Sequence, residues 1–84
     1  MNNIYGMYLM KHIVDGDYMY IKILLKDVRK RRNLSLEELS KKTGISKSHL
    51  NYIEREEKEP SLSMIIRIAV ALNIDEKELY KVLK

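Results

Sequence analysis

The stretch from Ser35 to Arg55 constrains the fold most, because it holds two short helix patterns separated by a single glycine. Ser35 opens the first with a capping box, in which its hydroxyl accepts from the N3 amide and Glu38 reaches back to the cap amide. Gly44 follows the first helix, where a left-handed residue is expected, and Ser46 caps the second. Two helices joined so closely predict either a DNA-binding helix-turn-helix or an ordinary corner between helices.

Apolar residues recur at helical spacing from residue 22 onward, and capping or turn residues separate the runs. Pro60 and Ser61 open a fourth helix, and Asp75 with Glu78 repeats the capping box before a fifth. The pattern predicts five helices, over residues 22–32, 36–43, 47–55, 62–72 and 75–83. The expected fold class is all-α, with a short β-hairpin preceding the helices.

Composition excludes several classes of protein. The chain has 84 residues, enough for one small domain with little room for a substrate cavity. It has no cysteine and two distant histidines, so we expect no disulfide and no metal or other cofactor. The sequence shows no Gly-rich phosphate loop, no catalytic triad and no paired carboxylates, so we expect no catalytic residue and no enzyme. No apolar run approaches the roughly 20 residues of a membrane span, and no basic signal segment begins the chain. We therefore expect a cytoplasmic protein, and its net charge of +4 hints at a polyanionic partner.

The two helix patterns between Ser35 and Arg55, which we call the corner, and the residues around them resemble a known family. Residues 24–72 are similar to the Cro/phage-repressor (Xre-type) helix-turn-helix family, whose fold is lambda-repressor-like. The elements that carry the resemblance are Leu34-Ser35, Gly44-Ile45-Ser46, Ile53-Glu54-Arg55 and Pro60-Ser61-Leu62. The resemblance implies a transcriptional regulator, in the first instance a repressor, that binds double-stranded DNA at a palindromic operator as a homodimer. The acidic cluster Glu56, Glu57 and Glu59 departs from a family loop that is often basic, and should weaken binding on that flank.

The resemblance also implies residue roles. Lys47, Ser48 and Tyr52 match base-reading positions, and Asn51 and His49 stand beside them as further candidates for contacts to bases. Ser46, Arg55 and Lys58 are the expected phosphate contacts. The alternative for each is the solvated polar face of a surface helix. Arg29 and Glu54 match a pair that ties the first helix to the third, so we expect a structural ion pair there.

Residues 1–21 form an extension to the helix-turn-helix domain, which we assign to residues 22–84. Asp15-Gly16 is a strong two-residue hairpin signal. A loop there places Val14 opposite Asp17, and the pairing continues along both strands. The paired positions that follow are His12 with Met19, Met10 with Ile21, and Tyr8 with Ile23. A tail without fixed structure or an artefact of the start site is the alternative.

The dimer surface has two candidates. One is the apolar face of the hairpin, represented by Tyr8, Met10 and Ile21, and the other is the fifth helix, with Tyr80 and Leu83. A function of a different class also fits the extension. The chain would then be an antitoxin or a similar protein-interaction module of the same family that masks a partner protein.

Overall fold

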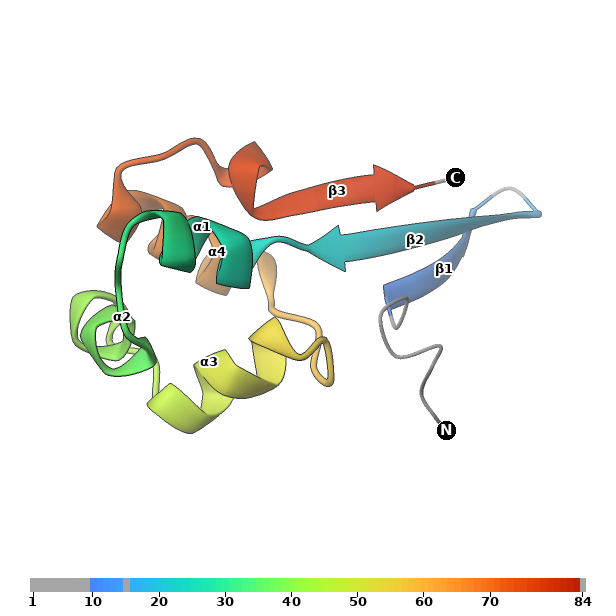
Figure 1. Ribbon diagram of the computed structural model, residues 1–84. Helices are drawn as coiled ribbons and strands as arrows, with labels where there is room; N and C mark the ends of the chain where they lie inside the picture. The colour runs from blue at the N-terminus through green and yellow to red at the C-terminus, as the bar shows by residue number, and fades with distance from the viewer. Residues whose placement is uncertain (1–9, 15, 84) are drawn as a thin grey trace.

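The computed structural model describes residues 10–14 and 16–83, with backbone alone for residues 10–14 and 17. The helices gather at one end of the molecule, and strands β2 and β3 run side by side away from them (Figure 1). The elements in chain order are β1 (Met10–Val14), β2 (Asp17–Ile23), α1 (Leu25–Arg31), α2 (Leu36–Thr43), α3 (Lys47–Glu54), α4 (Leu62–Leu72), the 3₁₀ helix η2 (Glu76–Leu79) and β3 (Tyr80–Leu83).

The predicted corner is confirmed in its detail. Ser35 Oγ accepts from the Glu38 backbone amide at 3.0 Å, and Glu38 Oε1 accepts from the Ser35 amide at 2.8 Å. Gly44 ends α2 with a φ of 75°, which an L side chain rarely adopts. Ser46 Oγ accepts from the His49 amide at 3.1 Å and so caps α3. Local signals therefore set both helices and the turn between them.

The prediction for the first helix begins too early, whereas the fourth helix matches its predicted bounds. Lys22 and Ile23 belong to β2, where they pair with Lys81 and Tyr80 of β3. The Leu24 amide then donates to the Leu79 carbonyl at 2.8 Å, and α1 starts only at the next residue. Pairing with the other end of the chain thus overrides the helical spacing of residues 22–24.

The prediction of a fifth helix over 75–83 is wrong, and the all-α class is wrong with it. Asp75 Oδ1 does cap a turn, since it accepts from the Lys77 amide at 2.9 Å, but the turn is the short 3₁₀ helix η2. The chain then extends into β3 and pairs antiparallel with β2. Aromatic Tyr80 and β-branched Val82 suit a strand, and the ladder supplies the backbone hydrogen bonds that a helix would otherwise make.

The N-terminal hairpin is present. β1 and β2 pair antiparallel with Met10 opposite Ile21, His12 opposite Met19 and Val14 opposite Asp17, which is the predicted register. Gly16 sits at the turn with a φ of 83°. The predicted pairing of Tyr8 lies outside the described residues. With β3 added, the sheet has three strands in the order β1-β2-β3, and the predicted boundary between residues 21 and 22 falls within β2.

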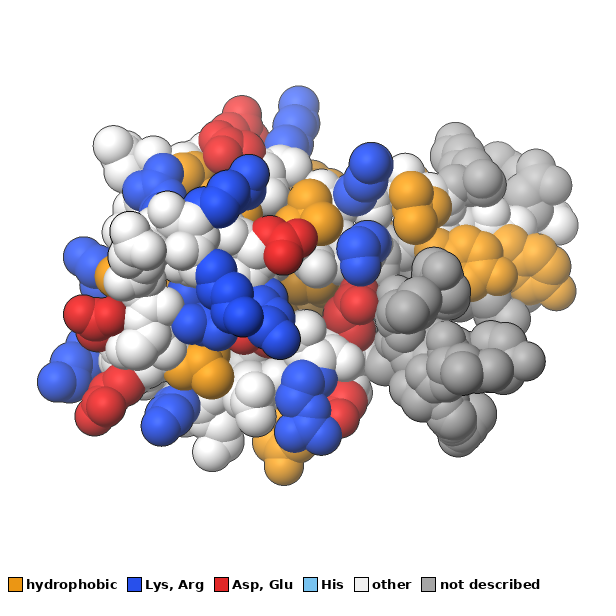
Figure 2. All heavy atoms as spheres, in the orientation of Figure 1, with side chains coloured by type: hydrophobic (Ala, Val, Ile, Leu, Met, Phe, Trp, Pro, Cys, Tyr) orange, Lys and Arg blue, Asp and Glu red, His pale blue; other side chains and the backbone are white. Residues whose placement is uncertain are grey.

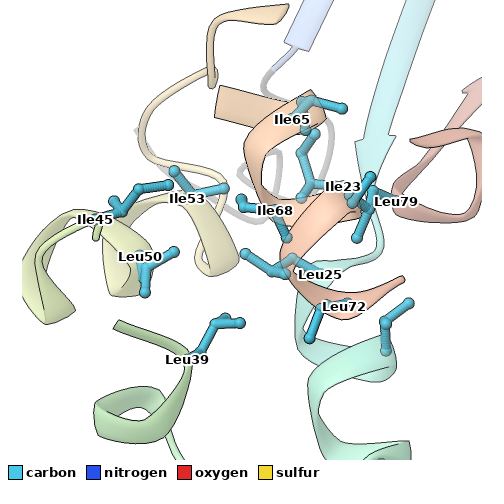
Figure 3. Close-up of a cluster of buried hydrophobic side chains, with 12 residues drawn as sticks. Ile23, Leu25, Leu39, Ile45, Leu50, Ile53, Ile65, Ile68, Leu72 and Leu79 are labelled. Carbon is cyan, nitrogen blue, oxygen red and sulfur yellow. The ribbon is translucent and has the colours of Figure 1, made fainter. Parts of the chain in front are cut away.

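One core lies where the helices meet the base of the sheet. The largest fully buried side chains come from every helix and from η2: Leu25, Leu39, Leu50, Ile53, Ile68 and Leu79. Figure 3 shows them converging, with Ile23 of β2 reaching in from the sheet. This core fixes α3 against the other elements and leaves its opposite face to solvent.

Candidate nucleic-acid interface

The outer face of α3 is polar and accessible. Lys47, Ser48 and Tyr52 are exposed, while His49 and Asn51 are half-buried at its edges. Leu50 and Ile53 alternate with them and are fully buried, so the packing of α3 determines which side chains face outward. All five predicted base-contacting residues therefore lie on one short helix, and three of them are exposed.

The start of α3 offers backbone donors. The first amides of a helix have no partner within it, and the helix dipole favours negative charge there. Ser46 uses Oγ to accept from the His49 amide, which leaves its hydroxyl hydrogen able to donate. The exposed Ser46 and Lys47 at this end can thus meet a phosphate oxygen from two directions.

The turn between α2 and α3 is fixed by side chains whose role sequence reasoning missed. Ser40 Oγ donates to the Ile45 carbonyl at 2.6 Å. Thr43 is buried, where its Oγ1 donates to the Leu39 carbonyl at 2.8 Å and accepts from the Ile45 amide at 3.2 Å. These bonds satisfy buried backbone groups and set the angle between the helices. The sequence signal for them is that both are small hydroxyl residues within four positions of Gly44.

Arg29 and Glu54, expected to pair, are in contact. Arg29 Nε donates to Glu54 Oε2 at 2.6 Å and Nη2 donates to Oε1 at 3.1 Å, a bidentate arrangement. Nη1 donates to the Leu34 carbonyl at 2.7 Å. The hydrogen bond to Glu54 raises the pKa of Arg29 above its ordinary value. One guanidinium therefore joins α1, the loop before α2 and the last residue of α3.

The loop after α3 holds the two cations expected to meet phosphate. Arg55 Nη2 lies 2.6 Å from Glu57 Oε2, and both side chains are exposed, at 57% and 40%. Lys58 Nζ lies 5.8 Å from the centre of the Tyr52 ring, within range of a cation–π contact. Exposed ion pairs are weak, so a phosphate can compete with Glu57 for Arg55.

The acidic cluster after α3 is divided, because Glu57 and Glu59 are exposed whereas Glu56 is buried. Glu57 pairs with Arg55, and Glu56 is buried with an exposed fraction of 6%. Figure 2 shows Lys and Arg side chains over α1, over the sheet and beside the C-terminal end of α3 on the face it presents. The expected repulsion of DNA by Glu56 therefore has no surface charge to act through.

The predicted dimer residues divide between the two faces of the sheet. Residues opposite each other in a ladder share a face, so Ile21 and Tyr80 lie on one side and Leu83, opposite Tyr20, lies on the other. Ile21 and Tyr80 line a cavity of about 240 Å³ with Ile23, Glu59, Pro60, Leu62 and Ile65. Tyr8 lies outside the described residues, and for Met10 only the backbone is described.

Two kinds of site are missing from the described part of the chain. No three His, Cys, Asp or Glu side chains there come together as a metal site. No helix in the same residues is both long and apolar enough to span a membrane.

The sequence is similar to known helix-turn-helix proteins. A family model described as "Helix-turn-helix" matches residues 25–79. The HTH-type transcriptional regulator SutR of Escherichia coli K12 is 38% identical over 55 residues, 66% of this chain and 31% of SutR. The ImmF control region 10 kDa protein of Bacillus phage phi105 is 38% identical over 52 residues, 62% of this chain and 58% of the phage protein. The chain thus spans about a third of SutR and somewhat over half of the phage protein.

A solved structure extends the similarity to three dimensions. The restriction-modification controller protein C.AhdI of Aeromonas hydrophila superposes with a TM-score of 0.62 at 33% identity. The match covers 64% of this chain and 82% of the controller protein.

Proposed function

Because the chain belongs to the helix-turn-helix family of the Cro/phage-repressor (Xre) type, we propose that it is a sequence-specific DNA-binding regulator of transcription. Members of this family are DNA-binding regulators and not enzymes. The observation that carries the proposal is the outer face of α3, where Lys47, Ser48 and Tyr52 are exposed above a fully buried opposite face. A chain of this kind would repress by occupying promoter DNA against polymerase, and it would act in the cytoplasm, where that DNA is.

In this proposal α3 lies in the major groove and α2 crosses the backbone. Lys47 donates to guanine O6 and N7, and Ser48 donates to or accepts from a neighbouring base. Tyr52 places its ring against a thymine methyl, with Lys58 held beside the ring. Asn51 and His49 are half-buried, so they read bases only at the edges of the contact.

Phosphate contacts come from Ser46, Arg55 and Lys58, together with the free amides at the start of α3. These groups stand before and after the helix, so they fix its register without reading sequence. Each neutralised phosphate releases counterions, and the slope of log K against log salt should be about −0.9 for each contact.

We propose a homodimer on a palindromic operator, because one α3 covers only half of such a site. Support comes from the sheet face that carries Ile21, Tyr80 and Val82, which is apolar and adjoins the exposed Leu62. Sedimentation of Ile21→Glu should show a weakened dimer. Lys22→Glu, on the opposite face, is the matched control and should leave the dimer unchanged.

The same face supports a second function, in which it masks a partner protein such as a toxin. A small protein with an apolar cavity beside an exposed leucine has room for a peptide segment of a partner. Co-purification with the product of a neighbouring gene would favour this function, and a homodimer that binds DNA alone would count against it.

The experiment for DNA binding is selection from a pool of duplexes with a random central segment. The full chain should enrich one sequence with two inverted half-sites about one helical turn apart. Enrichment of no sequence, or binding that does not change with salt, would contradict the proposal.

A further inference from the structure

Glu56 combines two unfavourable properties. Its backbone is left-handed, with a φ of 57°, a conformation that glycine adopts freely and a residue with a long side chain rarely does. Its carboxylate is also withdrawn from water, with 6% of the residue exposed. Burying a charged group is costly unless it is hydrogen-bonded. A residue that bears both costs is a candidate for a specific task.

The carboxylate has a definite partner. Glu56 Oε1 accepts from the Ile23 backbone amide at 3.0 Å. Ile23 is the last residue of β2, faces Tyr80 of β3, and puts its own side chain into the core. The bond therefore joins the loop after α3 to the base of the sheet, across 33 residues of sequence.

The backbone of Glu56 belongs to the turn that ends α3. The Glu56 amide donates to the Ile53 carbonyl at 3.0 Å, and the Glu57 amide donates to the Tyr52 carbonyl at 2.9 Å. Arg55 and Lys58 lie on either side of this turn. Any displacement of Glu56 thus moves both the end of α3 and the loop with its two cations.

We propose that Glu56 is a positioning residue that couples the sheet to the DNA-reading helix. Its carboxylate holds α3 and the adjacent loop at a fixed place relative to β2, so that a change at the sheet, such as pairing with a second copy, alters how α3 meets DNA. This inference rests on the proposed DNA binding.

Two substitutions separate positioning from folding. Glu56→Gly removes the carboxylate and relieves the left-handed backbone, so the turn itself should form at least as well. Glu56→Gln keeps the shape and an oxygen that can accept from Ile23. Glu57→Gln is the matched control, since it removes the same charge one residue away without touching the buried bond. Glu56→Asn, which tolerates the left-handed backbone and is too short to reach Ile23, serves as a second variant if Glu56→Gly does not fold.

The first measurement is affinity for the duplex selected by the wild-type chain and for a random duplex of equal length. It is made at a temperature where circular dichroism finds every variant folded. Glu56→Gly should lose about tenfold in the ratio of the two affinities, within the range usual for coupling between sites. Glu56→Gln and Glu57→Gln should keep the ratio within about threefold of wild type.

The second measurement is the amide NMR spectrum as the selected duplex is added. In the wild type and in Glu56→Gln, the amides of Ile23 and its neighbours in β2 should shift on DNA binding, because coupling acts in both directions. In Glu56→Gly they should not.

An unchanged affinity ratio in folded Glu56→Gly would overturn the inference and leave Glu56 as a contributor to stability alone. Failure of the wild-type chain to select any duplex would instead be failure of the proposed function.

Discussion

The corner formed by α2 and α3 and the three-stranded sheet are held together in different ways. The corner is closed by residues close in sequence: Ser35 with Glu38, Ser40 with Ile45, and Ser46 with His49. Strands β2 and β3 bring together segments far apart in the sequence, with Ile23 opposite Tyr80. The proposed DNA-reading unit is thus shaped by local bonds, while its placement depends on distant ones.

Two contacts between distant parts of the sequence end on the same short segment, residues 54–56. Arg29 holds Glu54, the last residue of α3, and the Ile23 amide holds Glu56, two residues later. α3 is thus formed locally but is tied in place from α1 and from the sheet. Variants that cut one kind of contact and spare the other test this division.

The largest effect should come from Arg29→Ala, which leaves Glu54 buried without its partner. We expect the free energy of unfolding to fall by about 3–5 kcal/mol, measured by urea denaturation. Arg55→Ala is the control, because Arg55 and Glu57 are also 2.6 Å apart but both are exposed. Its cost should be at most about 1 kcal/mol. Similar losses in the two variants would mean that the buried contact between α1 and α3 stabilises the protein no more than an exposed local ion pair.

The next effect concerns the sheet. Leu79 is fully buried directly before β3, so Leu79→Ala should cost about 3 kcal/mol and loosen the pairing of β3 with β2. Hydrogen exchange should then speed up in β3 before it does in α2 and α3. Val82→Ala, at a position 46% exposed, should cost less than about 1 kcal/mol. Equal acceleration in all elements would mean that corner and sheet unfold as one unit.

The third effect concerns DNA contacts of α3 and the loop that follows it. Lys47→Ala should cost about 1–3 kcal/mol of discrimination at particular base pairs, measured by competition between the selected duplex and its single-base variants. Lys58→Ala should weaken all sequences about equally and reduce the salt slope by about 0.9. If Lys47→Ala weakened the selected and random duplexes to the same extent, Lys47 would be a phosphate contact.

A smaller effect should follow from Ser35→Ala, which removes the side-chain half of the capping box. The expected loss is about 1 kcal/mol, measured by thermal unfolding, with the sheet unaffected. Ser63→Ala offers a control, since Ser63 is an exposed serine in the first turn of α4 and not its cap. An equally large loss of stability in Ser63→Ala would show that the Ser35 cap makes no specific contribution to the corner.

The smallest effect is on pH dependence. The hydrogen bond from the Ser35 amide lowers the pKa of Glu38 below its ordinary value. A carboxyl whose pKa is lower when folded stabilises the protein above its unfolded pKa, about 4.3, and loses that contribution as the pH falls through the folded value. Glu38→Gln should therefore be less sensitive to acid below about pH 4 than the wild type. An unchanged acid profile would show that the bond does not favour the charged form.

Residues 36–43, 47–54 and 62–72 could be predicted because their signals are local. A cap, a left-handed glycine and apolar spacing each act within one or two turns of helix, and the sequence displays them directly. The register of the hairpin could be predicted as well. Asp15-Gly16 specifies a two-residue loop, and the position of that loop fixes which residues of the two strands lie opposite each other. The identity of the side chains presented by α3 followed from the same spacing.

Residues 75–83 could not be predicted, because their local signals were outweighed. Asp75 caps a turn through the Lys77 amide rather than through the predicted capping box with Glu78. The chain after Leu79 then gains more from the ladder with β2 than from continuing a helix. No local pattern reveals that pairing, which exists only once residues 20–23 and 80–83 meet in the folded chain.

The sequence alone determined the helix-turn-helix corner, its exposed polar face and the N-terminal hairpin, because each depends on residues near one another in the chain. Only the tertiary structure decided the third strand, the sharing of dimer candidates between two sheet faces, and the burial of Glu56 against Ile23. Each of these depends on the pairing of segments far apart in the sequence. The β3 backbone finds its hydrogen bonds on β2, and the buried Glu56 carboxylate finds a donor in the Ile23 amide.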